Sequence, residues 1–343
     1  MYKYSLDNKR YTTLNYFYKT KFKKKVFKVS LNGGFSCPNK KNGQGGCIFC
    51  SKLGSGDFAG NVKDNLETQF NEVKDVMLKK WNDAYYIGYF QANTNTYAPV
   101  KDLKEKYETI LSLDNVIGLS IATRSDAISD EVLDYLEELN KRTFLTIELG
   151  LQSMHEETLN LINRGHDLKN FDECVKKLKN KNIRVVAHII NGLPFESKDM
   201  MIETVKHLNS LNIDGIKIHM LHIIKDTPLE ELYRKTNFHV LTKEEYIDIV
   251  IKQLELLNPK IVINRITSDP DKEQLLAPIW LCQKCQLLND IDKEMKKRNT
   301  YQGIKYWYVF YFAIYVITYL LSSRKLSFLT SFIIANELTT IIK

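Results

Sequence analysis

The sequence lacks an export signal at its start. It begins Met-Tyr-Lys-Tyr-Ser-Leu-Asp-Asn-Lys-Arg, and no apolar core follows these residues, whereas a secretory signal peptide carries one of roughly 7–15 residues behind its basic start. We therefore expect a cytoplasmic chain. In that reducing compartment, clustered cysteines bind metals more often than they form disulfides.

A strong charge of either sign is also missing. The net charge is +8, from 49 Lys and Arg against 41 Asp and Glu, and this balance permits an anionic partner without requiring one. The 343 residues are enough for one large domain or two small ones with a sizeable core.

Histidine is absent from the loop that holds three of the six cysteines. Cys37, Cys47 and Cys50 follow the apolar run 26–31, and the first histidine is His155. Structural zinc and iron–sulfur sites usually take four protein ligands. With three thiolates, a four-iron cubane keeps one iron open, as a catalytic zinc site keeps an open position. That iron can bind a cofactor or a substrate directly.

The same loop suits a bulky inorganic group. Its glycines at 43, 45 and 46 permit positive φ angles and a close approach of the backbone. Phe49 lies between the last two cysteines and could shield one face of the group.

Six apolar runs alternate with amphipathic segments along the chain. The runs cover 26–31, 84–90, 116–122, 144–149, 184–190 and 215–220, and apolar residues at helical spacing lie between most of them. Such strand–helix repeats predict an α/β fold with a parallel sheet and right-handed crossovers. Six units, rather than eight, indicate a partial (β/α)6 barrel, in which ligands bind at the carboxyl ends of the strands.

Four segments divide the chain. We expect a basic and aromatic N-terminal segment at 1–25, the barrel at 26–235, and a C-terminal α/β extension at 236–303 with a strand at 261–263. Residues 304–343 form an apolar tail of a different character.

The tail contains 18 consecutive uncharged residues, 306–323, close to the ~20 that a transmembrane helix needs. It is a membrane anchor, a helix packed on the domain, or extra translation past the usual end. We favour the last two together over the anchor.

The N-terminal segment has two interpretations. Residues 2–28 interleave Tyr and Phe with Lys. Cations that grip phosphates and rings that stack on bases are what single-stranded RNA sites use. The alternative, which we favour, is an amphipathic helix with a solvated basic face.

A second Cys-x-x-Cys pair, Cys282 and Cys285, falls in a helical pattern with only Cys174 left as a third ligand. We interpret the pair as coincidence rather than as an auxiliary cluster.

Several motifs follow one another in a specific order. They are Phe27-Lys28-Val29, Cys37-Pro38-Asn39, Cys47-Ile48-Phe49-Cys50, Gly54-Ser55-Gly56-Asp57-Phe58-Ala59-Gly60, Tyr89-Phe90-Gln91-Ala92, Thr94-Asn95-Thr96-Tyr97, Glu148-Leu149-Gly150-Leu151-Gln152-Ser153 and Asn163-Arg164-Gly165-His166. Together they resemble the YhcC/YtqA-like bacterial proteins, relatives of the Elp3-type enzymes in the radical S-adenosylmethionine (SAM) superfamily. The resemblance extends from near the N-terminus to about Gly303.

The resemblance implies a partial barrel and two cofactors, a [4Fe–4S] cluster on the three cysteines and SAM. The cofactor-binding residues that it implies follow successive strands; they are Phe49, Gln91, Ala92, Thr123, Gln152 and Arg164. The planar guanidinium of Arg164 suits the SAM carboxylate. A polar strand-to-helix turn with helix caps explains 93–96 equally well. Arg124 is either an anion ligand or part of a rim salt bridge.

Polar side chains interrupt three of the apolar runs. Glu148 shares a strand face with Gly150 and Gln152, and is either a structural ion-pair partner or a group that acts on the substrate. His188 is a candidate near the adenosyl group, although a lone His in an apolar run is more often a satisfied core residue. Lys217 and His219 share one face, which points either into the barrel or outward.

The implied chemistry is reductive cleavage of SAM to a 5′-deoxyadenosyl radical, which abstracts hydrogen from a substrate. The resemblance implies a modified wobble uridine of tRNA with an aminomethyl-type group at C5, and an electron donor such as flavodoxin or ferredoxin. Two other classes stay open. One is a radical enzyme that acts on a protein or small molecule, and the other, which we rank lower, is a non-enzymatic metal-binding module.

Overall fold

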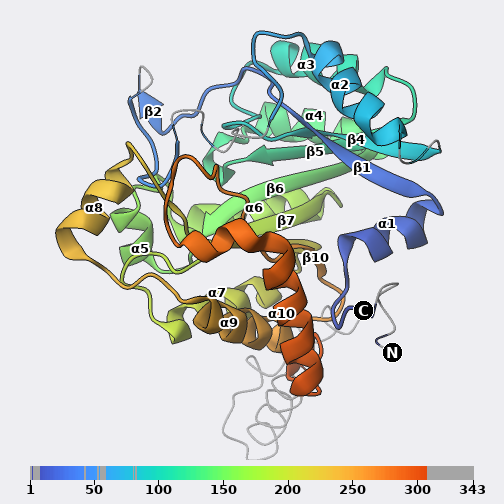
Figure 1. Ribbon diagram of the computed structural model, residues 1–343. Coiled ribbons are helices and arrows are strands. Elements are labelled where there is room, and N and C mark those ends of the chain that lie inside the picture. The colour runs from blue at the N-terminus through green and yellow to red at the C-terminus, as the bar shows by residue number, and fades with distance from the viewer. Residues whose placement is uncertain are drawn as a thin grey trace, which may run out of the picture.

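The computed structural model describes residues 2, 8–41, 44–51, 54, 59–79, 81 and 83–306 (Figure 1). Residues 55–58 of the glycine-rich motif and the tail from 307 onward lie outside the described residues. No helix within the described ranges is long and apolar enough to cross a membrane.

One curled parallel sheet organises the described chain, in the order β1-β4-β5-β6-β7-β8-β10. Its strands are β1 (Lys25–Leu31), β4 (Ala84–Phe90), β5 (Val116–Thr123), β6 (Phe144–Gln152), β7 (Arg184–Asn191), β8 (Gly215–Met220) and β10 (Val262–Arg265). The six predicted strands and the partial-barrel fold class are confirmed. The strand predicted in the C-terminal extension is β10, which joins the same sheet beside β8; the domain boundaries stay a prediction.

Helices follow most strands and cover the outer face of the sheet (Figure 1). They are α1 (Leu14–Phe22), α2 (Leu66–Leu78), α3 (Val100–Leu111), α4 (Asp130–Arg142), α5 (Glu156–Leu161), α6 (Leu168–Asn180), α7 (Lys198–Ser210), α8 (Pro228–Thr236), α9 (Lys243–Leu256) and α10 (Lys284–Lys297). Side-chain caps begin several of them: Ser129 accepts from the Val132 amide, and Thr242 forms a capping box with Glu245. Such caps satisfy amides that the first turn leaves without partners.

Two short antiparallel pairs lie beyond the sheet. β2 (Lys40–Lys41) pairs with β3 (Gln44–Gly45), and β9 (Ile223–Ile224) pairs with β11 (Leu275–Ala277). The 3-10 helix η1 (Ser125–Ala127) follows β5, and η2 (Ile279–Gln283) leads into α10. Cys282 lies in η2, while Cys285 is exposed in α10.

Alternation along the strands separates the core from the site. In β6, Ile147 and Leu149 are fully buried in the main hydrophobic cluster, and Glu148 between them points to the opposite face. The same alternation places Leu119 and Ile121 of β5 in the core on either side of Ser120. The outward faces are therefore apolar under the helices, and the inward faces carry polar groups.

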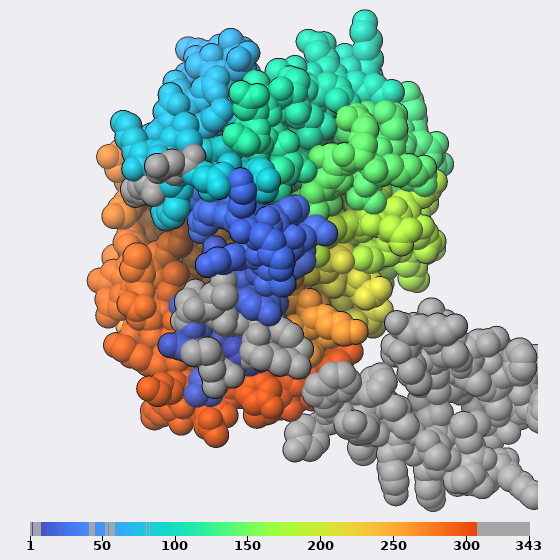
Figure 2. Space-filling model, turned by 90° about the vertical axis from the view of Figure 1, so that its right-hand side faces the viewer, coloured from blue at the N-terminus to red at the C-terminus, as the bar shows by residue number. Residues whose placement is uncertain are grey.

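The aromatic residues of the N-terminal segment are used in packing. α1 contacts β1 and β10, the two edge strands of the sheet, and the N-terminal region, in blue, lies at the centre of the face shown in Figure 2. The rings of Phe17 and Phe22 lie 6.3 and 5.2 Å from the ring of Phe144, the first residue of β6, and Tyr18 is buried. Packing on Phe144 therefore accounts for the placement of these three rings, while Phe17 and Phe22 stay partly exposed.

Candidate active site

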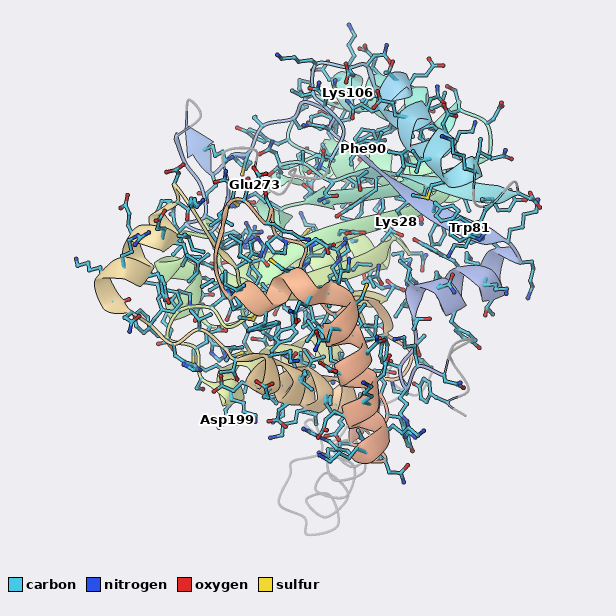
Figure 3. All side chains as sticks on the ribbon, viewed as in Figure 1. Lys28, Trp81, Phe90, Lys106, Asp199 and Glu273 are labelled. Atoms are coloured by element: carbon cyan, nitrogen blue, oxygen red, sulfur yellow. The ribbon has the colours of Figure 1, made fainter. Side chains whose placement is uncertain are left out.

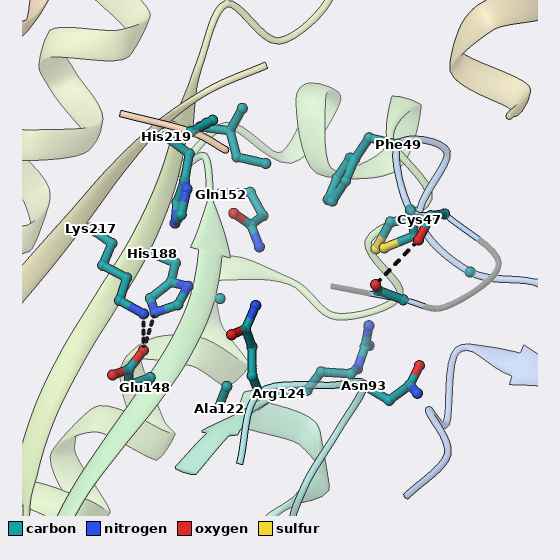
Figure 4. A pocket seen from close by; sticks show the side chains of 18 of the residues that line it. Cys47, Phe49, Asn93, Ala122, Arg124, Glu148, Gln152, His188, Lys217 and His219 are labelled. Atoms are coloured by element: carbon teal, nitrogen blue, oxygen red, sulfur yellow. Dashed lines mark hydrogen bonds and ion pairs between the residues drawn. The ribbon is translucent and has the colours of Figure 1, made fainter. Parts of the chain in front are cut away.

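A pocket opens at the carboxyl ends of the strands. Residues from β4, β5, β6, β7, β8 and β10 line it together with the cysteine loop. Glu148, His188 and Lys217 lie together on one side, Cys47 lies on the other, and Phe49 and Gln152 lie between them (Figure 4). The pocket therefore has a cysteine end and a polar end.

The cysteine loop is fastened to the turn after α5. The Asn39 side-chain amide donates to the Asn163 carbonyl at 2.7 Å, and the Asn163 amide donates to the Gly46 carbonyl at 2.7 Å. Gly165 has φ +78°, and a Cβ there would lie 2.5 Å from the Asn39 side-chain oxygen. A glycine is therefore required for this turn to approach the loop.

All three cysteines line the cysteine end. The Cys47 sulfur accepts weak hydrogen bonds from Arg164 Nη1 at 3.7 Å and Asn39 Nδ2 at 3.8 Å. The hydrogen bond from the Cys50 thiol, together with the positive charges of Arg164 and Arg124, lowers the pKa of Cys47 to about 5 against the effect of burial. The loop thus favours a thiolate, the form that binds metals.

Buried polar atoms beside the cysteines remain without partners. Gln152 Oε1 and Arg164 Nε make no hydrogen bond, although both residues line the pocket. Gln152 has φ +76°, a conformation that non-glycine residues rarely adopt and that is found more often at functional sites. Arg164 is held by its Nη2, which donates to the Gly150 carbonyl at 2.5 Å.

This donor set fits a thiolate-bound cluster with a polar, carboxylate-bearing ligand beside it. The cysteine end supplies soft ligands, and Arg164 and Gln152 have unused hydrogen-bonding capacity at the same place. Among the described residues, no group of three or more His, Cys, Asp or Glu side chains is arranged to hold a single metal ion.

One inward-facing side chain from each strand of the sheet gathers at or directly behind the polar end. These seven residues, the polar layer, are Lys28, Tyr89, Ser120, Glu148, His188, Lys217 and Arg265. Glu148 is at its centre and is 1% exposed. It accepts from Ser120 Oγ at 2.6 Å and His188 Nε2 at 2.8 Å, and forms ion pairs with Lys217 at 2.5 Å and with Lys28.

The polar layer has more cations than anions. Burial disfavours the charge on Glu148, but Lys217 and Lys28 hold the pKa of its carboxyl well below its usual range. Burial lowers the pKa of Lys217 to about 7, and Lys28 and Arg265 act in the same direction while Glu148 opposes them. Near neutral pH, Lys217 therefore lies close to its titration midpoint.

His188 and His219 are neutral at this pH. Burial and the nearby Lys217 lower the pKa of His188 to about 4, and burial and the nearby His188 hold the pKa of His219 well below its usual range. Their rings lie 5.4 Å apart. Lys217 and His219 thus point into the barrel, the question that strand alternation left open. His222 also lines the pocket, because β8 ends at Met220.

Most residues proposed from the sequence meet at this pocket, while Ala92 lies beside it. Ala92 is fully buried and does not line the pocket, whereas its neighbours Gln91 and Asn93 do. The Thr123 hydroxyl bonds to that of Thr96 at 2.6 Å. Arg124 forms a bidentate salt bridge to Asp126 at 2.7–2.8 Å.

Sequence analysis did not identify four members of the polar layer as site residues: Lys28, Tyr89, Ser120 and Arg265. A lysine at the centre of the run 25–31 and an arginine at the end of β10 were the available signals. Without knowledge of which strands face each other, neither could be placed near Glu148.

Comparison with protein families identifies the class. The model of the radical SAM superfamily matches residues 36–208, and that of the radical SAM C-terminal domain matches residues 213–297. The chain belongs to the radical SAM superfamily. It is 51% identical to the uncharacterized protein YtqA of Bacillus subtilis over 88% of this chain and 94% of YtqA. It is 31% identical to the protein YhcC of Escherichia coli K12 over 81% of this chain and 90% of YhcC.

The fold agrees with this assignment. The solved structure of Methanocaldococcus infernus Elp3 with an N-terminal deletion matches with a TM-score of 0.60 and 18% identity, over 81% of this chain and 64% of that chain. This radical SAM enzyme is thus a YhcC/YtqA-like protein related to Elp3. Its cofactors are the [4Fe–4S] cluster and SAM that the family uses.

Proposed function

We propose that this radical SAM enzyme acts on tRNA, at the C5 aminomethyl-type group of a modified wobble uridine. The substrate follows from the resemblance to Elp3-type enzymes and from the related fold of the archaeal Elp3. The observation that carries the proposal is the single pocket that joins the cysteine loop to the polar layer. A cofactor at one end and a substrate at the other can meet there without leaving the barrel.

The residues divide between the two ends. Cys37, Cys47 and Cys50 hold the cluster, while the side chains of Gln152 and Arg164 hold SAM. The other SAM contacts that we propose are Phe49, Gln91 and Thr123, while Ala92 supports them from behind because it does not line the pocket. Together the bound cofactors supply a 5′-deoxyadenosyl radical. The pocket positions the substrate beside them and excludes water.

Residues of the polar end orient the substrate and handle its protons. Glu148 stays ionised and fixes the side chains of His188 and Lys217 through its carboxylate oxygens. Lys217 can release or accept a proton near neutral pH because its pKa is about 7. Neutral His188 and His219 can each donate one hydrogen bond and accept another.

The reaction also needs an electron, for which we propose a flavodoxin or ferredoxin. Both the thiolate-bound cluster and this donor suit a reducing cytoplasm.

The test is formation of 5′-deoxyadenosine by the full chain. The protein is purified and reconstituted without oxygen, reduced with dithionite and given SAM. The reaction is run with and without tRNA isolated from cells that lack this protein. Cys50→Ala is the control for background cleavage. We expect a four-iron cluster and faster nucleoside formation with tRNA.

The other results are equally informative. Equal rates with and without tRNA would leave the enzyme class intact and remove the tRNA assignment, so that proteins and small molecules become the next substrates to test. Zinc in place of iron, with no cleavage, would contradict the assigned cluster ligands.

A further inference from the structure

An exposed aromatic ring lies in the loop after β7, a strand that lines the active-site pocket, in a conformation unusual for its type. Phe195 is 63% exposed and has φ +65°. Bulky residues rarely adopt this left-handed backbone conformation, which suits glycine. The position therefore holds a large ring where local geometry favours no side chain at all.

The loop that carries Phe195 is fixed at both ends. It connects β7 to α7. Asn191 exchanges two hydrogen bonds of 2.8 Å with the Gln253 side chain, and Glu196 accepts a hydrogen bond from Ser153, which follows Gln152 of the pocket. The ring is thus presented by a rigid segment that is attached to the pocket wall.

The buried ring of Phe238 packs against the exposed ring of Phe195. Phe195 contacts Phe238 edge to face with centroids 6.1 Å apart, and Phe238 contacts Tyr233 at 5.5 Å. Phe238 is only 5% exposed and belongs to a small hydrophobic cluster that also contacts Phe49. A continuous apolar contact therefore leads from the pocket to Phe195 at the surface.

Exposed cations accompany this ring. Arg234 and Lys235 lie in the last turn of α8 directly after Tyr233 and are exposed, Arg234 in an ion pair with Glu230, and the chain carries a net charge of +8. α8 lies on the same side of the molecule as α5 and β2, opposite α1 (Figure 1). A ring for stacking with cations for the backbone is the combination that single-stranded nucleic acid sites use.

We propose that Phe195 is a stacking platform for an unpaired base of the RNA substrate, next to the nucleotide that enters the pocket. This inference rests on the proposed tRNA substrate. A nucleobase fits better than an apolar protein segment, because Phe195 is a single exposed ring and not part of an exposed apolar patch among the described residues. Arg234 and Lys235 also follow Tyr233, which packs on the Phe238 ring that supports Phe195.

The test is binding of a fluorescein-labelled anticodon stem–loop RNA to the full chain, measured by anisotropy at one fixed salt concentration. Phe195→Gly removes the ring and also removes the strain of a bulky residue in the left-handed backbone conformation. We expect its melting temperature to stay close to that of the wild type while the Kd rises roughly five- to a hundredfold. Phe195→Trp keeps a stacking surface, and should bind within a few-fold of wild type with extra fluorescence quenching on RNA addition.

Trp81→Ala is the matched control. Trp81 is 42% exposed and lies on the opposite side of the molecule, near α1 (Figure 3), so its loss should leave RNA binding unchanged. If the wild type binds RNA and Phe195→Gly binds equally well, the platform is wrong and the tRNA proposal stands. If the wild type does not bind RNA, both are wrong. A lowered melting temperature with an unchanged Kd would show that the ring is structural only.

Discussion

The Lys217 ammonium donates a hydrogen bond of 2.9 Å to the Tyr89 hydroxyl, although three strands separate β8 from β4 in the sheet. In a flat sheet, four strand spacings would hold these strands roughly 19 Å apart. The contact therefore shows how strongly the sheet curls. The same curl brings Lys28 of β1 into contact with Glu148 of β6. The polar layer therefore fills the inside of the curled sheet next to the pocket.

Replacing Glu148 by Gln tests whether this carboxylate holds the layer together. Gln keeps the shape but removes the negative charge that both Lys28 and Lys217 contact. Breaking a buried ion pair by removing one partner typically costs about 3–5 kcal/mol, so we expect a loss of unfolding free energy of about 3 kcal/mol or more in urea titrations. Asp83→Asn, which breaks the exposed pair with Lys24, is the control and should have little effect. Equal stabilities of Glu148→Gln and wild type would contradict a structural role for the ion pairs.

The depressed pKa of Lys217 predicts a pH dependence of stability. Its value is about 7 in the folded chain against 10.5 for a free lysine, so between these values the unfolded chain binds more protons than the folded chain. The contribution of Lys217 to the unfolding free energy therefore increases as pH rises above about 7. Below about pH 7 this contribution no longer changes with pH, because Lys217 is protonated in both the folded and the unfolded chain. Lys217→Met lacks this group. The unfolding free energy of the wild type minus that of Lys217→Met should increase by up to about 1.4 kcal/mol for each pH unit between about pH 7 and about pH 9, measured by urea titration. A constant difference across this pH range would show that folding does not lower the pKa of Lys217.

Much of the fold followed from the sequence, because parallel strands buried on both faces leave long apolar runs. The cysteine loop, Gln152 and Arg164 could also be placed, since they follow strands whose carboxyl ends share an edge. The polar layer could not be assembled in this way. Contacts such as Lys217 to Tyr89 depend on the curl and register of strands far apart in the sheet, and alternation alone does not say which face becomes the lumen.

The N-terminal segment shows a related limit. Its interleaved rings and lysines fit both RNA binding and helix packing, and composition alone favoured an amphipathic helix. The packing of Phe22 against Phe144, at the edge of the sheet opposite the pocket, supports the helix-packing interpretation. Phe195 presents the reverse case, since a single aromatic residue in a loop carries no sequence signal of its unusual backbone.

Gly150→Ala should weaken SAM binding without unfolding the chain. A Cβ at this position would lie 2.7 Å from Gln152 Nε2 and 2.9 Å from Arg164 Nη2. Both are ends of flexible side chains, so they can move, but they then leave their positions in the pocket. Loss of one charge-assisted hydrogen bond costs about 1.5–3 kcal/mol, which corresponds to a roughly ten- to hundredfold higher Kd for SAM. Equilibrium dialysis with the reconstituted protein measures this, and iron content and melting temperature should stay at wild-type values. Unchanged SAM affinity would mean that Gln152 and Arg164 do not contact SAM.

Arg164→Gln separates the two contacts of this guanidinium. The variant loses the positive charge near the Cys47 sulfur and the donor to the Gly150 carbonyl, while the cysteine ligands themselves remain. If Arg164 binds the SAM carboxylate, the Kd for SAM should rise roughly ten- to hundredfold with the iron content unchanged. Arg142→Gln is the matched control, because Arg142 pairs with Glu108 on the exposed surface and should leave SAM binding intact. Loss of iron together with SAM affinity would instead assign Arg164 to support of the cluster loop, since its charge then acts on the thiolates rather than on the cofactor.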